Sequence, residues 1–372
     1  MDPRTRQEDF INLNPIQAGG RTSAKTRVLV NSYIDGYAVC DQCKGALSEI
    51  PKPDIVGLKM TMIDFLGVNT VRFTHGAREA KYLVMENLLE SGDSVVVDEN
   101  AHYSTFIGIE KVKAKKFIVS NTGYPKFKII PEKYEQVIKK VKKETNKFPK
   151  LLVITQVDGH YGNFVNVKKI NEIAKKYDIP LLVNSAYLVG RAEVKLNKLG
   201  ADFIIGSGHK SFGAPGNVGI LGVSNKWAEK LFQRSSDFPK KEVDSLGCTA
   251  RNAAIVGLAV AMESINQRVK KWDEEIKKAN WLVNKLERLG GFKLLGGKPK
   301  QHDLIYLETP VINKIAQSHR KRGYFFASAL KDKGIIGIRP GLSKAFKLST
   351  YGLTWSQVEY VYKVIKDVAK GE

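Results

Sequence analysis

The stretch Ile204-Ile205-Gly206-Ser207-Gly208-His209-Lys210-Ser211 decides how the rest of the chain is interpreted. It runs from the apolar residues of a short predicted strand, 203–205, into small residues and then a His-Lys pair. A lysine held at a fixed, partly desolvated point has a lowered pKa and becomes a nucleophile that can form a Schiff base. The small residues before Lys210 leave room for a cofactor. On its own the pattern is ambiguous, because glycine-containing turns beside a lysine also occur in ordinary loops.

A second stretch, Thr74-His75-Gly76-Ala77-Arg78-Glu79-Ala80, predicts an anion site at the start of a helix. The turn at Gly76 and Ala77 opens the predicted helix 77–89, whose first backbone N–H groups have no partner within the helix. Arg78 adds a guanidinium that can clamp a phosphate with two hydrogen bonds. The alternative is an ordinary helix start that carries a surface arginine.

Two further stretches follow predicted strands and carry groups suited to a planar ring. In Asp98-Glu99-Asn100-Ala101-His102-Tyr103-Ser104, an aromatic side chain at His102 or Tyr103 can stack on a ring. In Leu182-Val183-Asn184-Ser185-Ala186-Tyr187, Ala186 can pack on the opposite ring face while Asn184 meets a ring nitrogen. Any one of the four stretches is weak evidence, but together they supply an anchor, an anion site and both faces of a ring.

The chain around these stretches predicts an α/β fold with a mostly parallel sheet. Short apolar strands alternate with amphipathic helices, which is the pattern of βαβ units. In such sheets functional groups collect at the carboxyl ends of the strands. The predicted strands are 94–97, 116–119, 151–155, 180–183 and 203–205, and the predicted helices are 53–65, 77–89, 131–147 and 167–177.

We expect three regions along the 372 residues. Residues 1–50 read as an irregular N-terminal segment that brings Cys40 and Cys43 to the active site. Residues 51–265 form the large cofactor-binding domain, and 266–372 form a smaller α+β domain. Within the second half, 250–289 reads as one long helix, followed by strands 304–307 and 347–349 and helices 324–333 and 356–369.

The charge predicts a polyanionic partner. There are 60 Lys and Arg residues against 38 Asp and Glu residues, a net charge of +22. Nucleic acid is the commonest partner for such an excess, and solubility alone is the alternative. No apolar run reaches the roughly 20 residues that a membrane helix needs. The start Met1-Asp2-Pro3-Arg4 has no apolar signal region, so we expect a cytoplasmic protein with no membrane partner.

Three cysteines, Cys40, Cys43 and Cys248, argue against a disulfide-stapled protein. Cys40 and Cys43 are spaced C-x-x-C, which suits a redox pair, part of a metal or cluster site, or a sulfur-handling site. A structural zinc would usually need a second closely spaced pair, and none is present. Cys248 lies in Gly247-Cys248-Thr249-Ala250-Arg251, beside a potential anion ligand.

With these motifs in order, the sequence resembles the fold type I enzymes that depend on pyridoxal phosphate (PLP), which share the aspartate aminotransferase-like fold. It is closest to their cysteine desulfurase branch and, more narrowly, to the archaeal family of O-phosphoseryl-tRNA:cysteinyl-tRNA synthases. The resemblance covers nearly the whole chain. Besides the motifs above, it includes Asn12-Leu13-Asn14-Pro15-Ile16-Gln17-Ala18-Gly19-Gly20-Arg21, Gly36-Tyr37, Leu246-Gly247-Cys248-Thr249-Ala250-Arg251 and Phe346-Lys347-Leu348-Ser349-Thr350-Tyr351-Gly352.

The resemblance implies roles for individual residues. Lys210 would carry PLP and act as the base at Cα, and His102 would stack on the ring. The implied cofactor ligands are Gly76, Ala77, Arg78, His102, Asn163, Asn184, Ala186, Ser207, His209 and Lys210, with Asn163 at the ring hydroxyl. The implied substrate ligands are Arg21, Arg78, Tyr103 and Arg251. Cys40, Cys43 and Cys248 would handle sulfur as a persulfide, or would hold an iron–sulfur cluster through three thiolates.

The implied reaction replaces the phosphate of O-phosphoserine, esterified to tRNA(Cys), with sulfur to give cysteinyl-tRNA(Cys). β-Elimination of phosphate leaves a dehydroalanyl-tRNA, to which sulfur adds at Cβ. The implied partners are the charged tRNA, a sulfur donor, a second copy of the chain in a homodimer, the phosphoseryl-tRNA synthetase and an accessory protein. In the dimer, Cys248 and Arg251 would act on the neighbour's cofactor.

Two positions depart from the broader fold type I pattern. Asn184 stands where most such enzymes place an aspartate against the pyridine nitrogen, which predicts a weaker electron sink. Lys347 stands where desulfurase-like enzymes often carry an arginine for a free α-carboxylate. An aminoacyl-tRNA has no such carboxylate, so the loss fits that substrate, although Arg339 could supply the clamp.

Two other functions stay open at this point. A cysteine desulfurase or lyase acting on free amino acids would share the PLP site but would need a carboxylate-binding arginine and no large positive charge. A non-enzymatic RNA-binding protein on the same fold would tolerate the loss of Lys210. The charge, the three cysteines and the motif order favour the tRNA-dependent enzyme.

Overall fold

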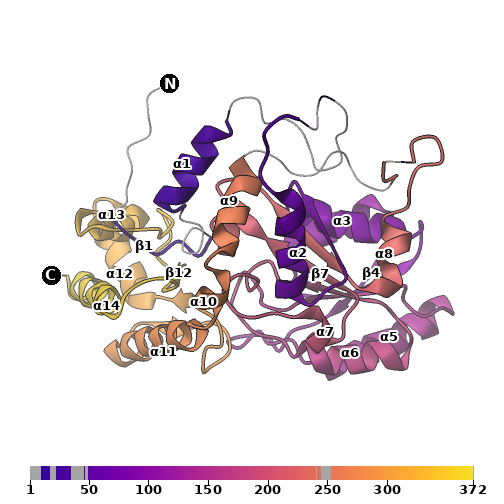
Figure 1. The fold of residues 1–372 in the computed structure, drawn as a ribbon. Coiled ribbons are helices and arrows are strands. Elements are labelled where there is room, and N and C mark those ends of the chain that lie inside the picture. Colours follow the sequence, from indigo (N-terminus) through magenta and orange to yellow (C-terminus); the bar gives the residue numbers. More distant parts are fainter. Residues whose placement is uncertain are drawn as a thin grey trace.

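The computed structural model describes residues 10–16, 22–34, 46, 49–239, 241–243 and 253–371. Its helices and strands alternate through the first two thirds of the chain (Figure 1). In chain order this part contains β1 (Ile11–Asn12), α1 (Ala24–Ser32), α2 (Ile55–Leu66), β2 (Thr70–Thr74), α3 (Ala77–Leu88), β3 (Ser94–Asp98), α4 (Tyr103–Lys111), β4 (Lys115–Val119), α5 (Glu132–Thr145), β5 (Leu151–Thr155), α6 (Val167–Lys176), β6 (Leu181–Asn184), α7 (Leu196–Leu199), β7 (Phe203–Ser207), the π-helix η2 (Gly208–Phe212), β8 (Gly219–Val223) and α8 (Asn225–Leu231).

The remaining elements build the smaller part of the molecule and its connection to the first. They are α9 (Ala253–Met262), α10 (Ile265–Val269), α11 (Trp272–Leu289), β9 (Lys293–Leu294), β10 (Leu304–Glu308), α12 (Pro310–Ser318), the short helix η3 (Arg322–Tyr324), α13 (Phe325–Asp332), β11 (Ile335–Ile336), β12 (Ala345–Ser349) and α14 (Trp355–Lys370).

A seven-stranded sheet with the order β2-β8-β7-β6-β5-β3-β4 forms the centre of the large part. The five strands from β7 to β4 are parallel, and at one edge β8 runs antiparallel to both of its neighbours, β7 and β2. This confirms the predicted mostly parallel α/β sheet. Strands β2 and β8 were not among the predicted strands.

Alternate residues of the central strands enter two different cores. Val96, Leu152 and Ile154 belong to the core on one sheet face, and Val95 and Val97 to the core on the other. Helices α2, α5, α6 and α9 contribute to the first core, while α3, α4 and α8 contribute to the second. Covering both faces explains why these strands read as continuous apolar runs.

The smaller part has its own core, built by α11 to α14 on the three-stranded antiparallel sheet β12-β10-β9. Strand β1 from the N-terminal region joins it, because Ile11 and Asn12 pair in parallel with β11 and Leu13 is fully buried in this core. Figure 1 shows the indigo β1 among the yellow C-terminal elements. The predicted domain limits at 50/51 and 265/266 stay predictions.

The single helix predicted for 250–289 is wrong, because the described part of this region, from residue 253, contains three helices with breaks near Ser264 and Lys271. Helix α9 is apolar on nearly all sides and is buried in the large core, whereas the amphipathic α11 buries Ala279, Leu282 and Leu286 in the small one. The chain changes direction where it passes from one core to the other. Residues 24–32, expected to be irregular, form α1, which packs against α9.

Candidate functional site

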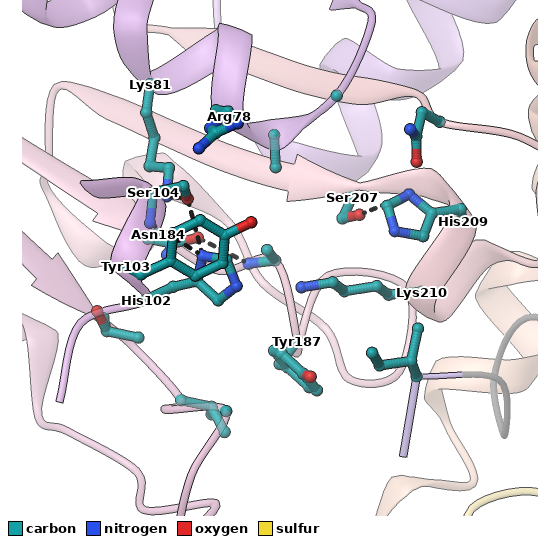
Figure 2. A pocket seen from close by; sticks show the side chains of 18 of the residues that line it. Arg78, Lys81, His102, Tyr103, Ser104, Asn184, Tyr187, Ser207, His209 and Lys210 are labelled. Atoms are coloured by element: carbon teal, nitrogen blue, oxygen red, sulfur yellow. Dashed lines mark hydrogen bonds between the residues drawn. The ribbon is translucent and has the colours of Figure 1, made fainter. Parts of the chain in front are cut away.

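A pocket of about 380 Å³ lies at the carboxyl ends of the parallel strands, where the predicted site residues gather. Sheet register brings Thr155 of β5 level with Asn184 of β6, and Asn184 level with Ile205 of β7. Figure 2 shows Lys81, Ser104, His102 and Tyr103 on one side of the pocket and Ser207, His209 and Lys210 on the other. Ten predicted site residues line it: Gly76, Ala77, Arg78, His102, Tyr103, Asn184, Ala186, Ser207, His209 and Lys210.

Lys210 lies on the π-helix η2, directly after β7, and its Nζ projects into the pocket (Figure 2). Single π-helical turns often occur at functional sites. The Nζ atom lies 4.3 Å from the ring centre of Tyr187. Burial, and then the nearby Arg191 guanidinium, lower the pKa of Lys210 to about 8. A lysine with this pKa has a substantial neutral, nucleophilic fraction near neutral pH.

The start of α3 offers backbone donors on which an anion could be held. The N-cap Gly76 has φ 149° and makes no side-chain cap bond. The first backbone N–H groups of α3, which have no acceptor within the helix, can therefore donate to a ligand. A Cβ at Gly76 would meet nothing within 4 Å, which leaves open space at the helix start. Arg78, one residue into the helix, lies with its guanidinium carbon 5.4 Å from the ring centre of Tyr103. A helix N-terminus with an arginine beside it suits a phosphate group.

His102 lies at the predicted pocket position and also caps a helix. It lines the pocket, and its Nδ1 accepts a hydrogen bond from the backbone N–H of Ser104, which caps α4. Burial, followed by the charges of Lys210, Lys81, His160 and Arg78, lowers the pKa of His102 to about 4. The imidazole is therefore neutral near pH 7.

Asn163 is not among the residues that line the pocket, and its contact with the cofactor stays a prediction. Its Nδ2 donates to the carbonyls of Lys126 and Phe127, and its Oδ1 accepts from the N–H of Gly297. Both Nδ2 protons and one acceptor position of Oδ1 therefore join this loop to the 126–127 and 297 backbone segments. Arg21, Cys40, Cys43, Cys248 and Arg251 lie outside the described residues.

Several pocket residues were missed by sequence reasoning, among them Lys81, Ser104, Thr155 and Tyr187. Lys81 is 2% exposed although it lies on a helix, where a lysine is normally a surface residue. The signal available was its spacing, because Ala77, Arg78 and Lys81 lie on one face of a helix. Thr155, at the end of β5, is 4% exposed, and its backbone N–H donates to Oδ2 of Asp98.

Lys347 of β12 lies against the pocket wall from the side of the small part. Its Nζ donates to the carbonyl of Gly159, a pocket-lining residue, at 2.9 Å, and lies 3.4 Å from Nδ1 of His160. Burial lowers the pKa of Lys347. The residue in the predicted carboxylate-clamp strand is thus already engaged with backbone.

Within the described ranges no three His, Cys, Asp or Glu side chains are grouped to hold a metal ion. No described helix is long and apolar enough to cross a membrane.

Comparison with known proteins decides the family. Residues 81–369 match the model of the family described as O-phosphoseryl-tRNA(Sec) selenium transferase, SepSecS. An O-phospho-L-seryl-tRNA:Cys-tRNA synthase of Methanococcus aeolicus is 44% identical, covering 99% of this chain and 95% of the relative. The synthase of the same name from Methanocaldococcus jannaschii is 45% identical, covering 99% of this chain and 97% of the relative. The chain belongs to the family of O-phospho-L-seryl-tRNA:Cys-tRNA synthases.

Solved structures agree with this family and with the predicted fold. A structure described as a SepCysS–SepCysE N-terminal domain complex has 44% sequence identity and a TM-score of 0.92, covering 99% of this chain and 96% of the other. A cysteine desulfurase from Thermococcus onnurineus NA1 has 19% identity and a TM-score of 0.79, covering 98% and 96%. At that identity the likeness shows the fold alone. The fold type I architecture predicted for the family is confirmed.

Proposed function

We propose that this chain converts O-phosphoseryl-tRNA(Cys) to cysteinyl-tRNA(Cys), using PLP and a sulfur donor. The observation that carries the proposal is the shared pocket of Lys210, at the end of β7, and the uncapped start of α3. It occurs in a chain whose relatives at 42–45% identity bear the name of this activity. The net charge of +22 supports a tRNA substrate.

The residues present fit PLP. Gly76, Ala77 and Arg78 offer free donors and a cation for its phosphate, in the space that a Cβ at Gly76 would enter. His102 and Ala186 line the pocket as candidates for the two ring faces, with Asn184 for the ring nitrogen. When bound at Lys210, PLP supplies an electron sink for the negative charge that develops at Cα.

The chain's own residues then move one proton and stabilise one leaving group. The neutral amine of Lys210 takes the proton from Cα, and the Cβ–O bond breaks with its electron pair leaving on phosphate. The Arg78 guanidinium at this wall can stabilise the phosphate that departs. Lys81, on the same face of α3, has a pKa that burial lowers to about 7, and its Nζ donates to Ser104 and Thr105. A sulfur nucleophile then adds at Cβ, and Lys210 returns the proton to Cα. Sulfide gives cysteinyl-tRNA directly. A cysteine persulfide gives a disulfide between the enzyme and the product, which a second cysteine thiolate cleaves by attacking the enzyme sulfur; cysteinyl-tRNA leaves as the thiolate, and an external thiol later reduces the new enzyme disulfide.

Further parts of the proposal come from the sequence and the relatives. We infer that Cys40, Cys43 or Cys248 carries the sulfur as a persulfide, and that Arg21 and Arg251 add to substrate binding. We also infer that the chain works as a homodimer. Since one relative was solved as a complex with the N-terminal domain of SepCysE, a protein of that kind is a further candidate partner.

A single-turnover assay tests this function. PLP-loaded protein is mixed with sulfide and phosphoseryl-tRNA, free phosphoserine or free cysteine, and cysteinyl-tRNA and phosphate are measured. We expect cysteinyl-tRNA from the charged tRNA alone, loss of that product in Lys210→Ala, and unchanged turnover in Lys230→Ala, an exposed lysine on α8. Alanine and persulfide formed from free cysteine, without any tRNA product, would instead identify a desulfurase.

A further inference from the structure

A chain of hydrogen bonds connects the buried Lys81 of α3 to the imidazole of His102. The Nζ of Lys81 donates to Oγ of Ser104 at 2.7 Å and to Oγ1 of Thr105 at 3.0 Å. Oγ of Ser104 lies 2.8 Å from Nδ1 of His102. Lys81, Ser104 and His102 lie together at the same side of the pocket in Figure 2.

The direction of these bonds follows from which atoms can only donate. The backbone N–H of Ser104 points to Nδ1 of His102 at 3.3 Å, and a backbone N–H is always a donor. Nδ1 must therefore be the unprotonated nitrogen of the ring. The Nζ of Lys81 donates to the Ser104 hydroxyl, so it occupies an acceptor site of that hydroxyl and leaves the hydroxyl's own proton for Nδ1.

We propose that Lys81 acts through Ser104 as a positioning residue that fixes the proton of His102 on Nε2 and keeps Nδ1 as an acceptor. His102 then presents one N–H donor and no free basic nitrogen. It can stack on a ring and donate a hydrogen bond, but it cannot compete with Lys210 for the Cα proton. The link to catalysis rests on the proposed function, whereas the tautomer is a property of the chain itself.

The charges around His102 act in the same direction. Lys210 on η2, Lys81 and Arg78 on α3, and His160 after β5 all disfavour a positive charge on the ring, in addition to its burial. The backbone N–H and the hydroxyl proton of Ser104 both point to Nδ1. A proton added to Nδ1 would face these two protons, which disfavours the charged ring. His102 is therefore expected to stay neutral near pH 7, where its pKa of about 4 leaves the ring unprotonated at Nδ1.

The experiment reads the tautomer directly in the full-length, PLP-free protein. Histidine labelled with ¹⁵N and long-range ¹H–¹⁵N correlation spectra distinguish Nδ1–H from Nε2–H, and His102→Asn assigns the signal among the six histidines. We expect an unprotonated Nδ1 and a protonated Nε2 across the neutral pH range. Ser104→Ala should raise the share of the Nδ1–H form by roughly fivefold, the effect of losing one neutral hydrogen bond.

Lys81→Met should shift the tautomer ratio in the same direction and raise the pKa of His102, because it removes one of the charges facing the ring. Lys111→Met, at the exposed end of α4, is the matched control and should change neither. If Lys81→Met does not fold, the tautomer ratio of His102 in Ser104→Ala is the deciding measurement. A wild-type spectrum with Nδ1–H, or ratios unchanged in both Ser104→Ala and Lys81→Met, would overturn the proposal whatever the outcome of the tRNA assay.

Discussion

At the residue scale, we propose that Asn184 determines how strong an electron sink the pocket can support. It lies at the end of β6, is 5% exposed, and its Oδ1 accepts from the N–H of Ala186 at 3.3 Å. Because the carbonyl end of the amide is used by backbone, the Nδ2 end is left to donate to a ring nitrogen. A donor there leaves that nitrogen without a proton, unlike an aspartate, which would keep it protonated.

We therefore expect Asn184→Asp to increase side transamination relative to phosphate elimination. A protonated ring nitrogen lengthens the life of the carbanion, so more of it is protonated on the cofactor instead of losing phosphate. The ratio of pyridoxamine phosphate formed to phosphate released measures this effect. Asn313→Asp, on α12 and outside the pocket, should keep the wild-type ratio. An unchanged ratio in Asn184→Asp would count against this view of the site.

At the scale of single elements, the sequence was sufficient where strands are buried on both faces. The central strands 151–155 and 203–205 were predicted closely because parallel strands covered by helices are continuous apolar runs. Strand β8 was missed although it is apolar, since Gly219 and Gly222 interrupt its pattern. Lys81 was missed because its burial depends on Ser104 and Thr105 of α4, over 20 residues away.

Gly219, one of the two glycines in β8, allows close packing of this strand against the start of α3. A Cβ at this position would lie 2.3 Å from Oγ1 of Thr74 and 2.4 Å from the carbonyl carbon and oxygen of Gly76, so glycine lets β8 lie against the start of α3. The anion site thus depends on an antiparallel strand that contributes no side chain to it.

Gly219→Ala should therefore displace the start of α3 and weaken PLP binding. We expect the dissociation constant to rise by roughly tenfold or more, since overpacking a well-packed site costs about 1–3 kcal/mol. Equilibrium titration with PLP measures it, and circular dichroism checks the fold. Gly216→Ala is the control, because its Cβ would make only an ordinary 3.6 Å contact with Ala254. Wild-type affinity in a folded Gly219→Ala protein would show that the helix start tolerates the shift.

At the scale of the whole molecule, a buried ion pair joins the large part, the small part and the segment that follows β1. Nη1 of Arg191 donates to Oδ2 of Asp303 at 2.6 Å, and both side chains are fully buried. Nη2 of Arg191 donates to the carbonyl of Pro15 at 2.7 Å, next to the pocket-lining Ile16. Nε2 of His302, the residue before Asp303, lies 3.1 Å from the carbonyl oxygen of the pocket-lining Tyr187. The sequence did not predict this ion pair, because its two residues are 112 positions apart and belong to no recognised motif.

Removing the Asp303 carboxylate should lower the free energy of unfolding by far more than the intact ion pair contributes to it. Asp303→Ala leaves the Arg191 guanidinium buried without a counter-charge, and the loss of one partner of a buried pair typically costs about 3–5 kcal/mol. Chemical denaturation of the apo protein measures the loss. Asp178→Asn, which removes the exposed partner of Lys226, should change the free energy of unfolding by no more than about 1 kcal/mol. Equal effects in the two variants would mean that the buried pair does not hold the parts together.

The same pair predicts how stability depends on acid. Burial raises the pKa of Asp303, but Arg191, His302 and the Ser349 hydroxyl lower it more, to about 2. A carboxyl whose folded pKa lies below its unfolded value stabilises the fold above the unfolded pKa, near 4, and this contribution disappears as the pH falls through about 2. The free energy of unfolding should therefore decrease from pH 4 to pH 2 in the wild type. In Asp303→Asn this part of the decrease should be absent, and a wild-type slope in that variant would assign the acid sensitivity to other carboxyl groups.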